Sequence, residues 1–317
     1  MDKKSVNKEI PPHEMTWGTG SGNTDTIPKI IWTFWDAQKA SPLVEICFSQ
    51  IRRLLPDYEF NIITKINAGN FIHDLPEIRT DISFINYTDI VRLKLISEYG
   101  GIWIDASVLL TENLDWISEI KTNEKVDFVG FFADSFTSDL DFPLIETWFF
   151  ASSPQNLFIK AWMKEFEKCY RSENPHLYFD AEKKSIPNFT QKIDGPLSNY
   201  LIAYLAVAKL MRLSNDYRLH LISSSDTAHH YTFGQKIPPH RLKMYFLNNA
   251  PIYHWKLIKF EKKGREALDN DLLNGLYTKD SALFKITQNK KYLRSQPHIF
   301  LSYVQFILKN FIKNLKK

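Results

Sequence analysis

Two consecutive glycines, Gly100 and Gly101, separate a helical pattern from a short apolar run, and this junction constrains the fold more than any other feature. Apolar residues recur at helical spacing over residues 88–99, which predicts a helix. The glycines end it, because glycine adopts the left-handed conformation that closes a helix. Residues 102–104 then predict a short central strand. Asp105 stands at the carboxyl end of that strand.

The first part of the chain predicts a strand–helix–strand unit. Residues 29–35 are apolar, β-branched and aromatic, as in a buried strand, and residues 58–63 predict a second strand. Between them, residues 42–55 have amphipathic spacing and open with Ser-Pro, a helix start signal. Such a unit implies a parallel sheet and an α/β fold. Further along, we predict a strand over residues 126–132 and helices over residues 154–170 and 197–213.

The composition is that of an ordinary globular protein, with 44% hydrophobic and 24% charged residues. No apolar run reaches about 18 residues, so no membrane-spanning helix is predicted. The first ten residues lack the apolar segment of a signal peptide. Cys47 and Cys169 lie far apart without a partner motif, and we expect both to be reduced. These features predict a cytoplasmic protein.

The charge is unevenly distributed. Residues 290–317 carry seven Lys or Arg and no acid, so subtracting seven from the net +4 leaves −3 for residues 1–289. This distribution argues against nucleic-acid binding, which needs basic charge across a folded face. From residue 297 the tail mixes aromatic, apolar and lysine residues. That pattern suits a helix lying on an anionic membrane surface, and also a helix docked on the body with solvated lysines.

Two oxygen-bearing side chains follow the predicted central strand. In open α/β sheets ligands bind beyond the carboxyl ends of the strands, where Asp105 lies. Ser107 points to the same side if the chain stays extended. A carboxylate and a hydroxyl are hard ligands that suit Mg²⁺ or Mn²⁺. The alternative is that both residues only end a strand and cap a turn.

The preceding helix carries a second pair, Asp89 and Arg92, which share one helical face. A carboxylate beside a guanidinium is able to hold sugar hydroxyls while Arg92 faces phosphate. The alternative is structural, because an acid in the first turn is favoured by the helix dipole and pairs with a nearby arginine.

Taken together, residues 86–107 resemble the signature of the capsular polysaccharide synthesis glycosyltransferases. The matching segments are Asn-Tyr-Thr-Asp-Ile-Val-Arg-Leu at residues 86–93 and Tyr-Gly-Gly-Ile-Trp-Ile-Asp-Ala-Ser at residues 99–107. These enzymes are similar to glycosyltransferase family 32 and, more distantly, to the glucosyltransferase domains of large clostridial toxins. Residues 27–32, 194–196 and 253–255 add weaker similarity, so the resemblance covers residues 27–260.

The resemblance implies a Rossmann-like nucleotide-sugar-binding domain of the GT-A type over residues 27–260. An irregular lead-in, residues 1–26, would precede it. A basic, amphipathic, helical extension, residues 261–317, would follow. It also implies a nucleotide-sugar donor, a bound Mn²⁺ or Mg²⁺, and retention of the anomeric configuration.

The family's functional positions carry over residue by residue. The strand of Trp32 would border the nucleoside base, Asp89 and Arg92 would bind the donor sugar, and Asp105 would be the first acid of an Asp-x-Asp metal motif. Ser107 stands where the second Asp is expected, which directs attention to His254 as a further metal ligand. The expected substrate-binding residues are Trp32, Thr33, Asp89, Arg92, Ile104, Asp105, Gly195 and Trp255, the catalytic ones are Asp89, Arg92 and Asp194, and the metal ligands are Asp105, Ser107 and His254.

Several of these positions have an alternative structural interpretation. Asp194 also fits a turn before a helix, and His254 and Trp255 also fit a packed strand end. His229 and its neighbour His230 are interpreted as a polar loop, because no metal-ligand spacing supports them.

The resulting hypothesis is a retaining hexosyltransferase that moves galactose or glucose from a UDP-sugar to a lipid-linked saccharide in bacterial capsule synthesis. It would work in the cytoplasm, peripherally on the inner face of the plasma membrane. One alternative is a toxin-like transferase that glycosylates a protein. Another is a decayed nucleotide-sugar-binding protein, which the missing second Asp keeps open.

Overall fold

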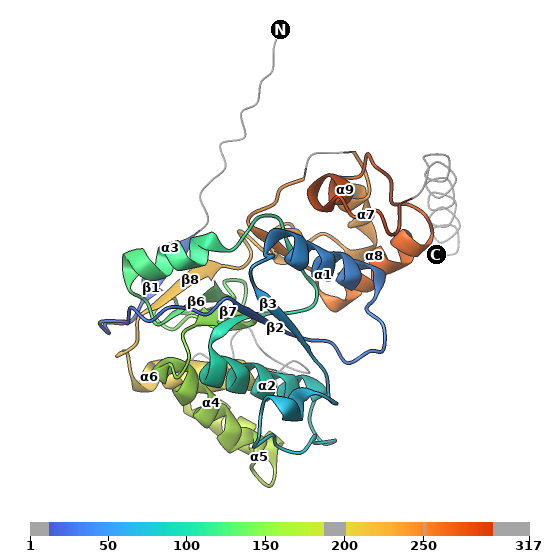
Figure 1. Cartoon of the computed structure of the whole chain (residues 1–317). Helices are drawn as coiled ribbons and strands as arrows, with labels where there is room; N and C mark the ends of the chain where they lie inside the picture. Colours follow the sequence, from blue (N-terminus) through green and yellow to red (C-terminus); the bar gives the residue numbers. More distant parts are fainter. Residues whose placement is uncertain (1–12, 187–200, 250–251, 294–317) are drawn as a thin grey trace.

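The computed structural model describes residues 13–186, 201–249 and 252–293. Within these ranges one seven-stranded sheet has the strand order β1-β8-β6-β7-β4-β2-β3, and β5 and β9 form a separate two-stranded sheet (Figure 1). The strands are β1 (Glu14–Trp17), β2 (Ile30–Phe34), β3 (Glu59–Ile63), β4 (Gly101–Ile104), β5 (Val108–Leu110), β6 (Phe128–Phe132), β7 (Ile145–Ser152), β8 (Leu219–Ser223) and β9 (Leu257–Lys259).

Helices cover both faces of the large sheet. Helices α2, α4 and α6 lie on one face and α1 and α3 on the other, with α5 beside α4 (Figure 1). The helices are α1 (Pro42–Leu54), α2 (Phe84–Tyr99), α3 (Asp115–Glu124), α4 (Leu157–Tyr170), α5 (Pro175–Ser185), α6 (Ile202–Leu213), α7 (Lys243–Phe246), α8 (Lys262–Leu273) and α9 (Ala282–Thr287). The α/β class predicted from the sequence is confirmed.

The directions of the strands bring most of their carboxyl ends to one edge. Strand β2 pairs in parallel with both β3 and β4. Strand β7 is antiparallel to β4 and to β6, so β6 runs in the same direction as β4, and β8 is parallel to β6. The carboxyl ends of β2, β3, β4, β6 and β8 therefore share an edge, and β7 begins there. The parallel sheet predicted from the sequence is thus a mixed one.

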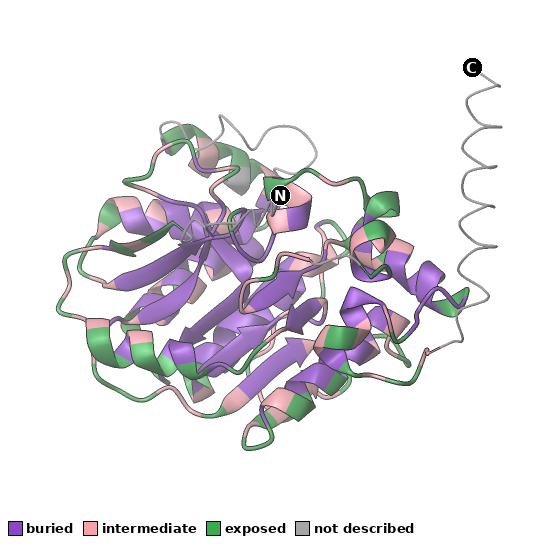
Figure 2. Cartoon of the chain, turned by 90° about the horizontal axis from the view of Figure 1, so that it is seen from above, coloured by how far each residue is buried: buried purple, intermediate pink, exposed green. Residues whose placement is uncertain are grey.

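Successive residues of the central strands enter two different cores, because side chains alternate across a strand. Trp32, Trp103 and Phe150 belong to the core beneath α2, α4 and α6, whereas Ile102 and Phe149 belong to the core on the α3 side. All five are buried, as are most residues of the sheet (Figure 2). Burial on both faces explains why these strands have continuous apolar sequences.

The junction between α2 and β4 requires both glycines. Gly100 has φ 66° and Gly101 has φ 96°, a region that L side chains rarely adopt. A Cβ atom on Gly101 would lie 2.5 Å from the carbonyl oxygen of Ile30 in the neighbouring strand. Helix α2 begins at Phe84, four residues earlier than predicted, because the Ser83 side chain accepts a hydrogen bond from the backbone N–H of Ile85.

Most predicted elements are present, but the prediction of an irregular lead-in is wrong. The strands β2, β3, β4 and β6 and the helices α1, α4 and α6 confirm the expected elements. The irregular lead-in, by contrast, contains the edge strand β1, which pairs with β8. With only Met15 and Trp17 turned inward, this strand is too short to produce a clear alternating pattern.

Helices α8 and α9 lie in the described part of the predicted C-terminal extension. Helix α8 packs on α1, where Leu268 and Leu272 share a core with Leu43 and Ile46. Residues 294–317, which include the basic tail, lie outside the described residues. Among the helices that are described, none is both long and apolar enough to span a bilayer.

Candidate functional site

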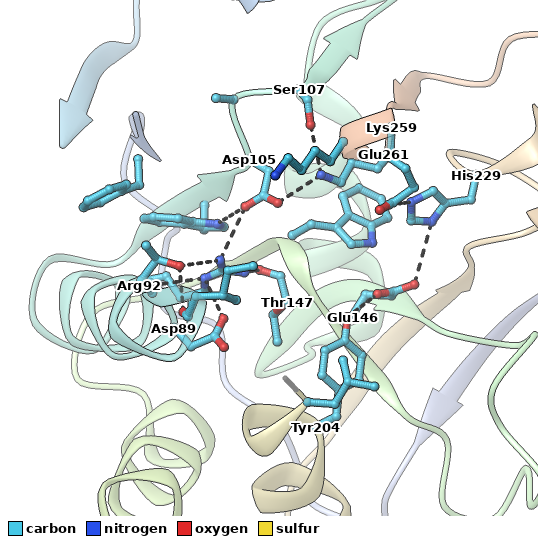
Figure 3. A pocket seen from close by; sticks show the side chains of 18 of the residues that line it. Asp89, Arg92, Asp105, Ser107, Glu146, Thr147, Tyr204, His229, Lys259 and Glu261 are labelled. Atoms are coloured by element: carbon cyan, nitrogen blue, oxygen red, sulfur yellow. Dashed lines mark hydrogen bonds and ion pairs between the residues drawn. The ribbon is translucent and has the colours of Figure 1, made fainter. Parts of the chain in front are cut away.

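A cavity of about 560 Å³ opens at the edge of the sheet where the strands have their carboxyl ends. This volume lies in the range of small-molecule sites, and the edge is the one where α/β proteins bind ligands. The charged residues that line it come from α2, β7, β9, α8 and the loops beside these elements, including the one after β4 (Figure 3). They include Asp89, Arg92, Asp105, Glu146, Lys259 and Glu261.

Asp89 and Arg92 lie side by side on α2 and are almost completely buried, with 2% and 5% of their surfaces exposed. Arg92 Nε lies 3.3 Å from Asp89 Oδ1. Burial raises the pKa of the Asp89 carboxyl to about 6, although the nearby Arg92 opposes the shift. Apart from this ion pair, Asp89 Oδ1 is buried without a hydrogen-bond partner among the described residues. A buried acceptor that lines a cavity in this way is suited to a ligand donor.

Arg92 connects α2 to the sheet. Its Nη2 lies 3.6 Å from Asp105 Oδ1 and its Nη1 donates to the backbone oxygen of Thr147. The guanidinium also lies 4.9 Å from the centre of the Trp103 ring, a cation–π distance. One cation therefore holds two carboxylates and the first residues of β7 in place.

Asp105 lies between two cations. Its Oδ2 accepts from Lys259 Nζ at 3.0 Å, and its Oδ1 accepts from Trp103 Nε1 at 3.1 Å. Burial alone would raise the pKa of Asp105, but Lys259 and Arg92 outweigh it and hold the pKa below its usual range. The same Lys259 Nζ donates to Ser107 Oγ at 3.0 Å, so the lysine spans both positions of the motif (Figure 3).

Backbone pairing fixes Lys259 at this place. In the small sheet, Val108 of β5 is paired with Lys259 of β9. Phe260 N donates to the Ser107 carbonyl oxygen at 3.0 Å, and Ser107 Oγ donates to the Phe260 carbonyl oxygen at 2.8 Å. The Ser107 hydroxyl thus gives its proton to a backbone carbonyl and accepts from a lysine.

A second charged cluster lines another part of the cavity. Glu146, at the start of β7, accepts from the Tyr204 hydroxyl at 2.5 Å, and its Oε1 lies 3.7 Å from His229 Nδ1. His229 Nε2 lies 2.9 Å from Glu261 Oε1. Burial raises the pKa of Glu146, whereas His229 outweighs burial at Glu261 and brings its pKa to about 2. His229 lies in the turn after β8, as a loop residue, but it is only 1% exposed and lines the cavity, a role that the sequence did not predict.

The structure brings four of the predicted residues to the cavity, namely Asp89, Arg92, Asp105 and Ser107. Trp32, Thr33 and Ile104 are buried and do not line it. Trp32 faces the core beneath α2, where its Nε1 donates to the Gly100 carbonyl oxygen at 3.0 Å. Strand β2 contributes its last residue, Phe34, to the cavity lining, and the residue after it, Trp35, also lines the cavity.

The predicted site residues His254 and Trp255 also lie outside the cavity lining. His254 is exposed, and Trp255 packs against Trp116 and Phe131 with ring centres 5.2 and 5.8 Å apart. The chain turns Trp255 toward the core and leaves the histidine at the surface. Asp194 and Gly195 fall outside the described residues.

The predicted Mn²⁺ or Mg²⁺ does not fit the side chains that the structure describes. Asp105 is the one carboxylate of the motif, the Ser107 hydroxyl is already used, and the Lys259 ammonium contacts both. Nowhere among the described residues do three or more His, Cys, Asp or Glu side chains form a group able to hold a metal. Small divalent cations bind carboxylate, carbonyl and water oxygens, and a lysine ammonium repels them.

Sequence reasoning missed Lys259, Glu146 and Glu261. Each of these residues lies next to a short apolar run, which predicts a place near the end of a strand. The sequence does not show which strand ends lie together in the fold. Glu261 and the residue after it, Lys262, line the cavity, so the predicted extension from residue 261 contributes to the site.

The fold and the cavity define an α/β protein with a charged cavity at the carboxyl ends of its strands, the place where proteins of this class bind ligands. Residues 8–181 match the family model described as capsular polysaccharide synthesis protein. Because this match spans more than half of the chain, the protein belongs to that family.

Two curated relatives share less than 30% sequence identity with this chain. The chain is 28% identical over 167 residues to the O-glycosyltransferase braB of Annulohypoxylon truncatum, and 27% identical over 166 residues to the glycosyltransferase afumC of Aspergillus fumigatus. Each match covers 46% of this chain, and the two cover 38% and 42% of the relatives. The chain therefore aligns with less than half the length of either. Their names agree with the glycosyltransferase class predicted from the sequence.

Similarity to solved structures is low. The glycosyltransferase PaToxG matches with a TM-score of 0.32 and 12% identity over 61% of this chain and 89% of its own. An active-site mutant of LgtC matches with a TM-score of 0.30 and 11% identity over 55% and 70% of the two chains.

Proposed function

We propose that this protein is a glycosyltransferase of the GT-A type that binds a nucleotide sugar in the cavity. The observation that carries the proposal is the group formed by Asp89, Arg92 and Asp105 at the carboxyl edge of the sheet, with 3.3 and 3.6 Å between the arginine and the two acids. This arrangement offers a buried acceptor for sugar hydroxyls next to a cation for phosphate. Membership of the capsular polysaccharide synthesis family supports it.

The proposed reaction exchanges two bonds at the anomeric carbon. The bond from this carbon to the donor phosphate oxygen breaks, and an acceptor hydroxyl oxygen bonds to the carbon. The hydroxyl proton passes to the departing phosphate oxygen, and a nucleoside diphosphate leaves. Arg92 and the other cations of the cavity stabilise the negative charge that develops on the leaving group. If the acceptor attacks from the face that the phosphate leaves, the anomeric configuration is retained.

The finer assignments extend this proposal. The donor would be UDP-galactose or UDP-glucose, and the acceptor a lipid-linked saccharide of a bacterial surface polymer. Contact of the basic tail with the inner face of the plasma membrane would bring the enzyme to such an acceptor. The dependence on Mn²⁺ or Mg²⁺ stays a prediction from the family resemblance.

A panel of nucleotide sugars tests the proposal. UDP-galactose, UDP-glucose and GDP-mannose would each be added at about 100 times Kd, where a true ligand stabilises the fold by about 2.7 kcal/mol. We expect one of them to raise Tm and to be hydrolysed slowly. A panel without any stabilisation would contradict the proposal. Donor binding without sugar transfer to any acceptor would favour the decayed nucleotide-sugar-binding protein. Transfer of labelled sugar to a protein rather than to a glycan would favour the toxin-like enzyme.

Donor affinity should depend on pH through Asp89. Because burial raises the pKa of this carboxyl to about 6, it is mostly protonated at pH 5 and mostly ionised at pH 7. Only the ionised form pairs with Arg92 and accepts sugar hydroxyls strongly, so we expect affinity to fall by up to roughly tenfold between pH 7 and pH 5. Titration calorimetry would measure it. Asp89→Asn should bind weakly with a flat profile, and an unchanged slope in that variant would assign the effect elsewhere.

A further inference from the structure

We propose that the Lys259 ammonium takes the place of the divalent cation, so that this protein binds and cleaves its donor without a metal. The inference rests on the proposed glycosyltransferase function and deepens it, because it names the group that faces the leaving diphosphate. It departs from the metal dependence that the family resemblance implies.

Lys259 lies at the position where a metal ion bound by an Asp-x-Asp motif would be expected. Its Nζ lies 3.0 Å from Asp105 Oδ2 and 3.0 Å from Ser107 Oγ, the two side chains that stand at the positions of an Asp-x-Asp motif. A cation that joined these two oxygens would occupy the same point. The lysine is 9% exposed and belongs to β9, whose pairing with β5 fixes its backbone next to the motif. The contact is thus built into the fold.

The substitution of serine for the second acid fits this arrangement. A divalent ion is held by several oxygens, most of them charged, whereas an ammonium needs only acceptors for its three N–H groups. Asp105 and Ser107 supply two such acceptors, and a third N–H is left to face a ligand in the cavity. A metal ion bound by Asp105 and Ser107 would contact the positively charged Lys259 ammonium, which repels it.

Other cations of the cavity add to the charge that one lysine provides. Arg92 lies 3.6 Å from the other oxygen of the same carboxylate. Lys262 and Arg265 also line the cavity, and they are three residues apart in the first turn of α8, so they share one face of that helix. A diphosphate carries several negative oxygens, which these cations are able to meet together.

Nucleotide binding with and without metal tests the inference. UDP and GDP would be titrated into the whole protein in EDTA and in Mn²⁺ by calorimetry. The wild-type affinity should agree within about threefold between the two conditions, and Lys259→Met should lose about 10²-fold or more in both. Lys256→Met is the matched control, because Lys256 precedes β9 and pairs with the exposed Glu112 at 2.8 Å, away from the cavity. It should bind like the wild type.

A second variant, in which an acid is added and the lysine is removed, tests the inference if Lys259→Met folds poorly. The double variant Ser107→Asp with Lys259→Ala restores two acids and removes the ammonium, so it should bind UDP only with Mn²⁺. Compared with Mn²⁺ and UDP in the absence of protein, the electron paramagnetic resonance spectrum of Mn²⁺ should broaden further when this variant is added, and should not change when the wild type is added.

The outcomes separate the two proposals. Wild-type affinity that falls more than about tenfold in EDTA and returns with Mn²⁺ would overturn the inference and leave the glycosyltransferase proposal intact. If neither nucleotide binds under any condition, the proposed function fails and the inference falls with it.

Discussion

Replacement of Asp105 by asparagine is expected to reduce donor hydrolysis by about 10²-fold or more, since electrostatic groups at reacting centres contribute on this scale. The carboxylate accepts from Lys259 and faces Arg92 on its other oxygen. Asparagine has nearly the same shape but carries no charge, and its N–H₂ group has to face one of the two cations. The cations would then lose the positions from which they meet the diphosphate.

Hydrolysis would be followed by chromatography of the released nucleotide in EDTA and in Mn²⁺. We expect the same loss in both, because Asp105 acts here through the cations that it positions. Asp57→Asn removes one carboxylate from an exposed turn and is the matched control. Full activity of Asp105→Asn would show that the donor is not cleaved in the cavity beside Asp105.

The part of the site predicted from sequence lies on one continuous segment. Asp89, Arg92 and Asp105 are separated only by the end of α2, two glycines and β4. Local rules determine this geometry, because a helix places residues three apart on one face and a strand carries its last residue to the sheet edge. The fold class follows from similar local patterns.

The rest of the site depends on pairing between distant segments, which no local pattern reveals. Lys259 reaches Asp105 only because β9, three residues long, pairs with β5, where Val108 is opposite Lys259. Glu146 reaches the same edge because β7 runs antiparallel to β4, with Ile104 opposite Phe149. Apolar runs predict that strands exist, but their partners and directions are decided by the packing of the whole sheet.

Replacement of Arg92 by methionine is expected to lower the free energy of unfolding by about 3–5 kcal/mol, the usual cost of breaking a buried ion pair from one side. Arg92 is 5% exposed and is the cation nearest to Asp89. Methionine fills much of the same space, so the loss comes mainly from charge. Two carboxylates would remain close to one another, and of the two only Asp105 would keep a cation, Lys259.

The pH dependence of this loss identifies its cause. Burial already raises the pKa of Asp89, Arg92 lowers it and Asp105 raises it, so removal of Arg92 should raise it further. An acid whose pKa is higher in the folded than in the unfolded protein contributes stability below its unfolded pKa and loses it as pH rises through the folded value. Urea unfolding of Arg92→Met should therefore show a smaller deficit at pH 5 than at pH 8.

A double-mutant cycle separates charge from packing. In the Arg92→Met background, Asp89→Asn should restore part of the stability at pH 8, because it removes the carboxylate that lost its partner. In the wild type the same change should destabilise the protein, because it leaves Arg92 with one acid fewer. If the deficit of Arg92→Met is equal at pH 5 and pH 8 and Asp89→Asn does not relieve it, the arginine stabilises the fold through its contacts with Trp103 and Thr147 rather than by neutralising the acids of the cavity.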